Sequence, residues 1–134
     1  MNEQGATNSG PATWARFETR GNVLVAAVQL AEIRDAKTAY DFRDAVLAQL
    51  ERQLAVHVVF DFSAVKFIGS VGFLAFLGVR RKQPTGRIVL CNLSPQIREM
   101  FEVCRLLARD ELDTAAPFEG ADTLDAALAT LGVH

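Results

Sequence analysis

The chain has 134 residues, 50% of them hydrophobic, and a formal net charge of −2 from 14 basic and 16 acidic residues. This length suits one domain with a single hydrophobic core and is too short for two ordinary domains. The near-neutral charge gives no electrostatic reason to expect direct nucleic-acid binding. With no signal-like N-terminus and no apolar run of about 20 residues, we expect a cytoplasmic protein without membrane insertion.

The N-terminal segment 1–13 is polar and rich in Gly, Asn and Thr. It cannot bury enough apolar surface to offset its ordering entropy, so a flexible tail is predicted there and a folded domain over 14–134. Two extended segments follow, around 15–18 and 23–28. Gly21-Asn22 between them is typical of a β-hairpin.

An amphipathic helix is predicted over 36–54 and a buried strand over 56–62, where most residues are β-branched or aromatic. His57 lies within this strand and is expected to be packed there, because no nucleophilic constellation accompanies it in the sequence. Asp61 ends the strand. We expect its carboxylate to orient the following loop through Ser63.

A second helix is predicted over 70–82, ending in the basic run Arg80-Arg81-Lys82, which is typical of a solvated helix C-terminus. A strand over 87–92 follows. Ser94-Pro95 then indicates a helix start, because serine caps the helix and proline there lacks only an N–H that would be unpaired. Cys91 in this strand and Cys104 on the apolar stripe of the following helix are both expected to be small core residues rather than a disulfide.

A short strand is expected within 113–119, and a last helix from Asp122 or Thr123 to Gly132. Strands that alternate with helices in this way predict an α/β fold. We expect a single domain with a mixed, mostly parallel sheet of about four or five strands, edged by the N-terminal hairpin, and about four helices.

The most informative stretch is 61–78, where a buried strand ends, Ser70 follows and an apolar helix begins. The first turn of a helix has unpaired N–H groups and the positive end of the helix dipole, so it favours a phosphate. Ser70 therefore has two compatible roles, an N-cap hydroxyl and a phosphate acceptor. Gly69 before it is expected to relax the turn, because glycine can adopt a positive φ without strain, and to leave the hydroxyl more exposed.

Every residue in the run 71–79 is apolar or glycine. A surface helix needs polar residues opposite its core stripe, so this helix is either covered all round or presents apolar side chains to a partner. For the second case, the expected partner-binding residues are Gly69, Ser70, Val71, Phe73, Phe76 and Leu77.

Catalysis finds little support in the sequence. It contains no Walker-type phosphate loop, no recognisable pair of catalytic carboxylates, no metal-ligand spacing and only two histidines. We therefore expect a protein that is not an enzyme and that needs neither a metal nor a cofactor.

Together, the stretch 61–78 and the downstream stretch 92–101 (NLSPQIREMF) resemble the STAS domain of bacterial anti-sigma factor antagonists, and the resemblance extends over about 15–132. In that family the turn before the helix usually reads Asp-Ser-Ser-Gly or Asp-Ser-Thr-Gly, and a partner kinase phosphorylates its first serine. Ser70 aligns with this serine. Gly69 replaces the family aspartate, and Val71 replaces the second hydroxyl residue.

The resemblance implies partner switching. The unphosphorylated protein would bind an anti-sigma factor that is also a serine protein kinase, and so free a sigma factor for transcription. Phosphorylation of Ser70 would release the complex, a phosphatase would reset it, and ATP would belong to the kinase. The changes at Gly69 and Val71 keep open a second possibility, a non-phosphorylated STAS scaffold or accessory subunit of a larger signalling or lipid-transport complex. The expected oligomeric state is a monomer or weak homodimer.

Overall fold

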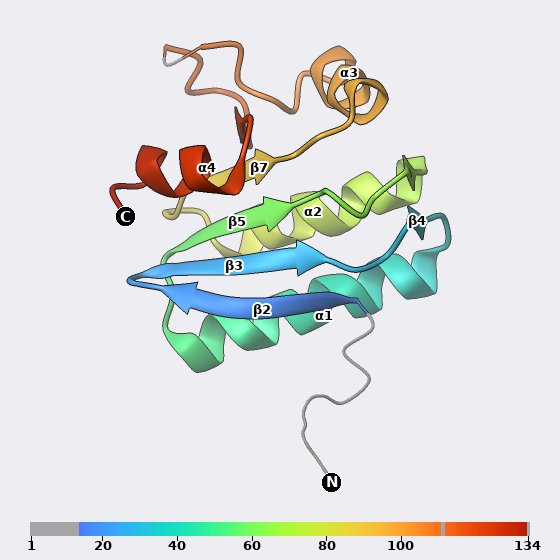
Figure 1. Cartoon of the computed structure of the whole chain (residues 1–134). Coiled ribbons are helices and arrows are strands. Elements are labelled where there is room, and N and C mark those ends of the chain that lie inside the picture. The colour runs from blue at the N-terminus through green and yellow to red at the C-terminus, as the bar shows by residue number, and fades with distance from the viewer. Residues whose placement is uncertain (1–13, 111, 134) are drawn as a thin grey trace, which may run out of the picture.

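The computed structural model describes residues 14–110 and 112–133, so the predicted tail at 1–13 lies outside the described residues. These residues form a five-stranded sheet in the order β2-β3-β5-β7-β8 (Figure 1). Its strands are β2 (Ala15–Arg20), β3 (Val23–Val28), β5 (His57–Asp61), β7 (Ile88–Cys91) and β8 (Glu119–Ala121). The helices of the described residues are α1 (Ala36–Gln53), α2 (Ser70–Lys82), α3 (Pro95–Val103) and α4 (Leu124–Thr130).

The β2–β3 hairpin is antiparallel, and every other neighbouring pair in this sheet is parallel. Gly21 occupies the hairpin turn with φ +60°, a left-handed conformation that glycine adopts without strain. The predicted α/β fold, with a mixed and mostly parallel sheet edged by the hairpin, is therefore confirmed.

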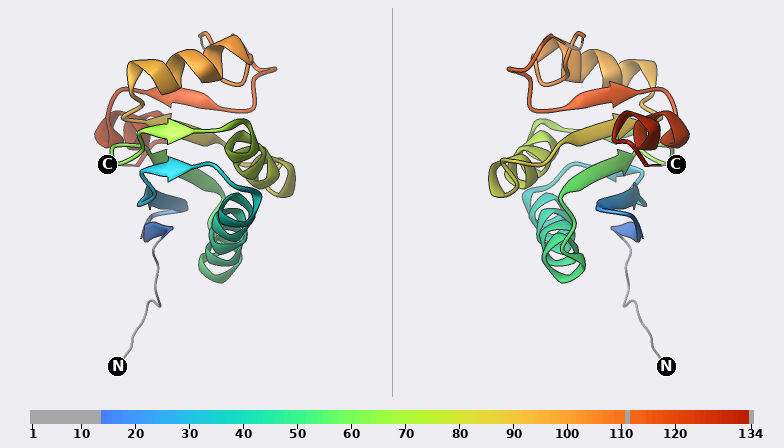
Figure 2. Two further views of the ribbon diagram at one scale, coloured as in Figure 1. Left: turned by 90° about the vertical axis from the view of Figure 1, so that its right-hand side faces the viewer. Right: turned by 90° about the vertical axis from the view of Figure 1, so that its left-hand side faces the viewer.

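Helices cover both faces of the sheet. Helices α1 and α2 lie on one face and α4 lies on the other (Figure 2). Strand residues divide between the two faces by alternation: Val58 and Phe60 pack with α1, α2 and α3, whereas Val59 packs with α4. This double coverage explains why β5 reads as a nearly continuous apolar run.

Phenylalanine rings form the centre of the larger core. Phe76 of α2 lies 5.0 Å from Phe60, 5.3 Å from Phe42 and 5.2 Å from Phe62, measured between ring centroids. Phe101 of α3 joins them, with its ring 4.8 Å from that of Phe73 and edge-on to it. Ring pairs at these distances stabilise the core beyond simple area burial.

A second sheet of two short parallel strands, β4 (Glu32–Ile33) and β6 (Phe67–Ile68), precedes α2. It was not predicted, because two-residue strands leave no periodicity in a sequence. It explains the glycine in the first turn of α2, since a Cβ on Gly72 would lie 2.5 Å from Cγ2 of Ile68. The small sheet therefore packs so closely against the start of α2 that no side chain fits at position 72.

Two predictions near the C-terminus were wrong in detail. The last strand begins at Glu119, where the predicted range ended, because residues before it are drawn into a bridge between Leu107 and Phe118. Cys91 is buried as expected, but Cys104 is exposed. Helix α3 ends at Val103, so Cys104 is its C-cap residue and no longer continues the apolar stripe.

Candidate partner-binding site at the start of helix α2

Helix α2 begins one residue earlier than a Ser70 cap would require. Gly69 is the N-cap residue, with φ −79° and ψ 172°, and Ser70 is the first helical residue. The N-cap role predicted for Ser70 is therefore wrong. Gly69 does not use the positive φ that glycine can adopt. The cap has no side-chain hydrogen bond, and Ser70 is exposed.

Backbone hydrogen bonds fix this helix start. The Gly69 N–H donates to the Ile33 carbonyl at 2.8 Å, and the Gly72 N–H donates to the Gly69 carbonyl at 2.9 Å. The N–H groups of Ser70 and Val71 come too early in the helix to have an intrahelical acceptor. They lie at the positive end of the helix dipole, which favours an anion beside Ser70.

Two of the predicted partner-binding residues face the core instead. Phe73 is 8% exposed and Phe76 is fully buried, because both lie on the stripe that packs against Phe101 and Phe60. Their assignment to an exposed interaction face is wrong. The apolar residue that α2 does expose is Leu74, at 50%, which the sequence analysis did not single out.

Helical spacing places Leu74 and Leu77 on the same side of α2 as Ser70, since residues four and seven apart share a face. Leu77 is half-buried, as are Gly69 and Val71. The structure therefore brings Ser70, Gly69, Val71 and Leu77 together on or beside one stripe and adds Leu74 to it. Counting this spacing from Ser70 would have found Leu74 in the sequence.

An apolar groove lies between β6 and α3. It has a volume of about 520 Å³ and is lined in part by Phe67, Met100, Val103 and Cys104. Three of its side chains are substantially exposed: Phe67 by 38%, Met100 by 36% and Val103 by 73%. The Phe67 ring comes within 3.7 Å of the position that a Cβ on Gly69 would occupy, so the groove borders the start of α2.

Asp61 is a structural acceptor at the end of β5. Its carboxylate accepts hydrogen bonds from the Ser63 N–H at 3.0 Å, the Ser63 hydroxyl at 2.5 Å and the Asn92 side-chain amide at 3.0 Å. Burial raises the pKa of Asp61, but the bonds from Ser63 and Asn92 outweigh it and leave the pKa below its usual value. The predicted role in orienting the loop through Ser63 is confirmed.

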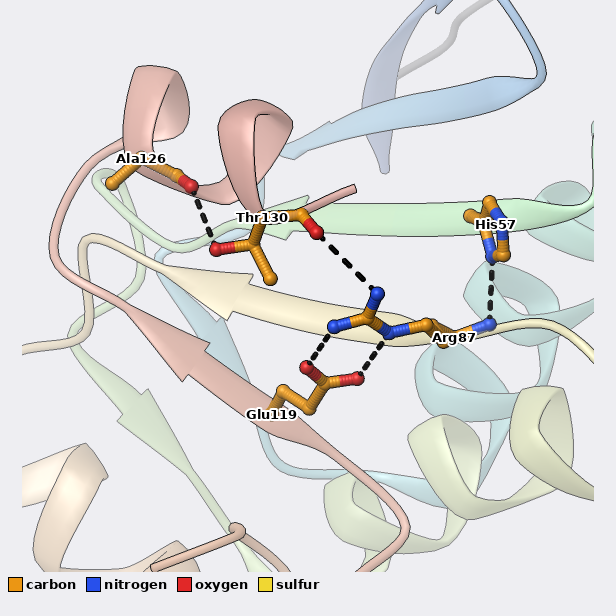
Figure 3. A network of polar contacts seen from close by, with 5 residues as sticks. All are labelled: His57, Arg87, Glu119, Ala126 and Thr130. Carbon is orange, nitrogen blue, oxygen red and sulfur yellow. Dashed lines mark hydrogen bonds and ion pairs between the residues drawn. The ribbon is translucent and has the colours of Figure 1, made fainter. Parts of the chain in front are cut away.

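His57 belongs to a different polar network, at the amino ends of the parallel strands (Figure 3). Its Nδ1 accepts the Arg87 backbone N–H at 2.9 Å. The Arg87 guanidinium binds both carboxylate oxygens of Glu119, at 2.8 and 2.6 Å, and donates to the Thr130 carbonyl at 3.3 Å. His57 is thus a packed strand residue, as predicted, in a network that joins β5, β7, β8 and α4.

Within residues 14–110 and 112–133, no three His, Cys, Asp or Glu side chains are grouped so that they could hold a metal ion. None of the helices in these ranges has the length and apolar character to cross a bilayer.

One curated relative and three solved structures show what this chain is similar to. BtrV of Bordetella bronchiseptica, named as an anti-sigma factor antagonist, is 36% identical over 69 residues, which is 45% of this chain and 60% of BtrV. The chain thus spans about 60% of that relative's length. A STAS domain protein from Planctomyces limnophilus has a TM-score of 0.67 at 20% identity, covering 87% of this chain and 96% of that one.

The anti-sigma factor antagonist SpoIIAA, in its unphosphorylated form, has a TM-score of 0.62 at 20% identity, covering 88% of this chain and 97% of SpoIIAA. Its phosphorylated form, from Bacillus, matches with a TM-score of 0.61 at 21% identity and covers 87% of this chain and 98% of that one. At such identities the structural likeness shows a shared fold. The family model of the STAS domain matches residues 16–116, which is more than half of the sequence. The chain belongs to the STAS domain family.

Proposed function

We propose that this protein is a cytoplasmic anti-sigma factor antagonist that binds an anti-sigma factor and is switched by phosphorylation of Ser70. The observation that carries the proposal is the position of Ser70. It is exposed at the first position of α2, is not the cap residue, and shares a helix face with the exposed Leu74. The relatives named as anti-sigma factor antagonists support this function.

The binding surface in this proposal has two parts. Ser70, Leu74 and Leu77 form the stripe on α2, and the groove between Phe67 and α3 continues it. An exposed apolar surface of this kind is typical of an interface with another protein. A serine at its border would lie against the partner in the complex.

In the switching reaction, the partner kinase transfers the γ-phosphoryl group of ATP to the Ser70 Oγ. The hydroxyl proton passes to a base of the kinase, and ADP leaves. The phosphate adds a charge of about −1.5 to −2, which the helix start tolerates, so the domain keeps its fold. The interface does not tolerate it, because an unpaired buried charge costs on the order of several kcal/mol.

The second candidate is a STAS scaffold or accessory subunit that is not phosphorylated. Gly69 and Val71 favour it, because a carboxylate that could contact a kinase or its nucleotide is missing beside Ser70. The backbone does not require glycine at position 69, so the absence of a carboxylate there is not forced by the fold. A Cβ at position 69 would meet its nearest atoms at 3.6 to 3.8 Å, which is ordinary contact.

The test compares two variants of Ser70 with the wild type against the cognate anti-sigma factor kinase. We expect Ser70→Ala to bind the kinase and to take up no phosphate, and Ser70→Asp to fold normally and bind at least about tenfold more weakly, a loss of about 1.4 kcal/mol. The matched control is Thr85→Asp, which adds the same charge in an exposed turn beyond the other end of α2. Mass spectrometry after incubation with ATP locates the phosphate, and calorimetry measures binding.

Phosphate at a residue other than Ser70, or equal affinities of Ser70→Asp and the wild type, would reject the switch. Binding without phosphorylation of any residue would support the scaffold. If Thr85→Asp weakened binding to the kinase as much as Ser70→Asp, the loss of affinity would come from net charge and not from the position of Ser70.

A further inference from the structure

The two edges of the main sheet differ. At the β8 edge, the segment around Leu107 covers Phe118, whose N–H donates to the Leu106 carbonyl at 3.1 Å while its carbonyl accepts the Ala108 N–H at 2.8 Å. At the opposite edge, β2 pairs with β3 and with no other described strand. Figure 1 shows β2, in blue, as the outermost strand.

The hairpin register shows which backbone groups of β2 face outward. The Trp14 carbonyl accepts the Gln29 N–H at 2.8 Å, and the same pairing continues through the hairpin. In an antiparallel ladder, alternate residues exchange both of their hydrogen bonds with the partner strand. The even-numbered residues therefore face β3, and Ala15, Phe17 and Thr19 direct their N–H and C=O groups away from the sheet.

Charged side chains alternate along one face of this strand: Arg16, Glu18 and Arg20. Charge is a common protection of sheet edges, because charges of one sign repel a copy of the same strand in every register. Here the signs alternate. Alternating charges repel in some registers and attract in others, so they can select one pairing.

We propose that the edge of β2 is a homodimerisation surface, where β2 of a second copy pairs antiparallel about a two-fold axis at Phe17. In this register Phe17 lies opposite Phe17 and Ala15 lies opposite Thr19, so the outward N–H and C=O groups of both copies exchange hydrogen bonds. Such a contact is isologous and closes with two copies, joining the two sheets into one.

The charges favour this register over its neighbours. It places Arg16 opposite Glu18 in both halves of the dimer, at the positions without backbone hydrogen bonds, where side chains approach most closely. If the two-fold axis moves by one residue to Glu18, Glu18 lies opposite Glu18 of the other copy. If it moves by one residue to Arg16, Arg16 lies opposite Arg16. A longer shift toward the hairpin runs the pairing into the Gly21-Asn22 turn.

The dimer is weak and reversible. The strand has six residues, and an interface built on such an edge falls below the roughly 1,200 Å² of a standard protein interface. It lies on β2 and does not use the stripe on α2, so it is independent of the proposed function. The full chain is therefore tested alone, by sedimentation velocity from about 10 μM to about 1 mM.

The expected result is a dimer fraction that grows with concentration in the wild type. In Arg16→Glu, the introduced glutamate of one copy lies opposite Glu18 of the other. In Glu18→Arg, the introduced arginine lies opposite Arg16 of the other copy. Both pairs repel, so each variant alone should dimerise at least about tenfold more weakly than the wild type. An equimolar mixture of the two variants should regain the dimer, because both cross-strand pairs are then attractive. Arg52→Glu, an equal charge change at an exposed site in α1, is the matched control and should leave the dimer intact.

Thermal melts followed by circular dichroism check that each variant is folded. The regain of association in the mixture cannot come from misfolded chains. A wild type that stays monomeric to about 1 mM would overturn the proposal and leave the edge to another protein or to residues 1–13. A dimer that neither variant weakens, or a mixture that does not recover it, would equally reject this register.

Discussion

At the scale of single residues, two glycines near the start of α2 have different reasons to be glycine. Gly69 has an ordinary extended backbone and room for a Cβ. Gly72 has no such room, because its Cβ would lie 2.5 Å from the Ile68 side chain and 3.2 Å from the Ile33 carbonyl. The fold therefore needs glycine at position 72 and not at position 69.

This contrast predicts opposite results for two substitutions. Gly69→Asp supplies a side-chain acceptor at the N-cap and should leave stability unchanged or raise it by a few tenths of a kcal/mol. Gly72→Ala should destabilise the protein by about 1 to 3 kcal/mol, because the helix and the small sheet must move apart. Urea denaturation measures both. A clear loss of stability in Gly69→Asp would show that the cap position does require glycine.

At the scale of elements, α3 combines a buried side with an exposed one. Phe101 is fully buried, with its ring within 6.3 Å of those of Phe73, Phe76 and two other phenylalanines. Met100, its neighbour in the chain, is 36% exposed and lines the groove. One helix thus contributes both to the core and to the candidate binding surface.

Truncation of these two neighbours should therefore differ in cost. Phe101→Ala should destabilise the fold by about 3 to 5 kcal/mol, the usual loss for a buried aromatic residue. Met100→Ala should cost clearly less, about 1 to 2 kcal/mol, because its side chain is partly in water and borders an open groove. Chemical denaturation tests the pair, and equal losses for both would mean that the burial of α3 is assigned wrongly.

The elements also show what could be predicted from the sequence. Strong periodicity and cap residues identified α1, α3 and the hairpin, since each depends on contacts that repeat along the chain. For α2, the apolar run 71–79 hides which side is buried, so Phe73 and Phe76 were placed on the wrong face. The groove was not predicted, because it brings Phe67 together with a helix about 30 residues later in the sequence, and no local pattern carries that contact.

At the scale of the whole molecule, polar networks connect strands at both ends of the sheet. His57 and Arg87 join β5 and β7 at the amino ends, and Asp61 and Asn92 join the same strands at the carboxyl ends. Burial, followed by the charge of Arg87, lowers the pKa of His57 from its ordinary value of 6.5. The pKa of Asp61 is also below its ordinary value, 3.8.

These shifts predict that stability falls in two steps as the pH falls. The unfolded chain takes up a proton on His57 below about pH 6.5 more readily than the folded one, so the first loss begins there. The hydrogen bonds to the ionised Asp61 carboxylate stabilise the folded state above pH 3.8. This stabilisation is lost as the pH falls below that value and the carboxylate takes up a proton. Urea denaturation at about pH 7.5 and about pH 5.5 measures the first step.

The matched variant for the first step is His57→Asn, which can accept the Arg87 N–H and cannot take up the proton. We expect the difference in stability between the two pH values to shrink in this variant. An unchanged difference would show that another group causes the step.

The two cysteines differ in their chemical reactivity. Burial raises the pKa of the Cys91 thiol to about 12, so the reactive thiolate is scarce there at neutral pH. Cys104 is exposed on the border of the groove. A maleimide dye should therefore attach at Cys104 alone without any engineering of the chain, and its fluorescence would report directly on whatever occupies the groove.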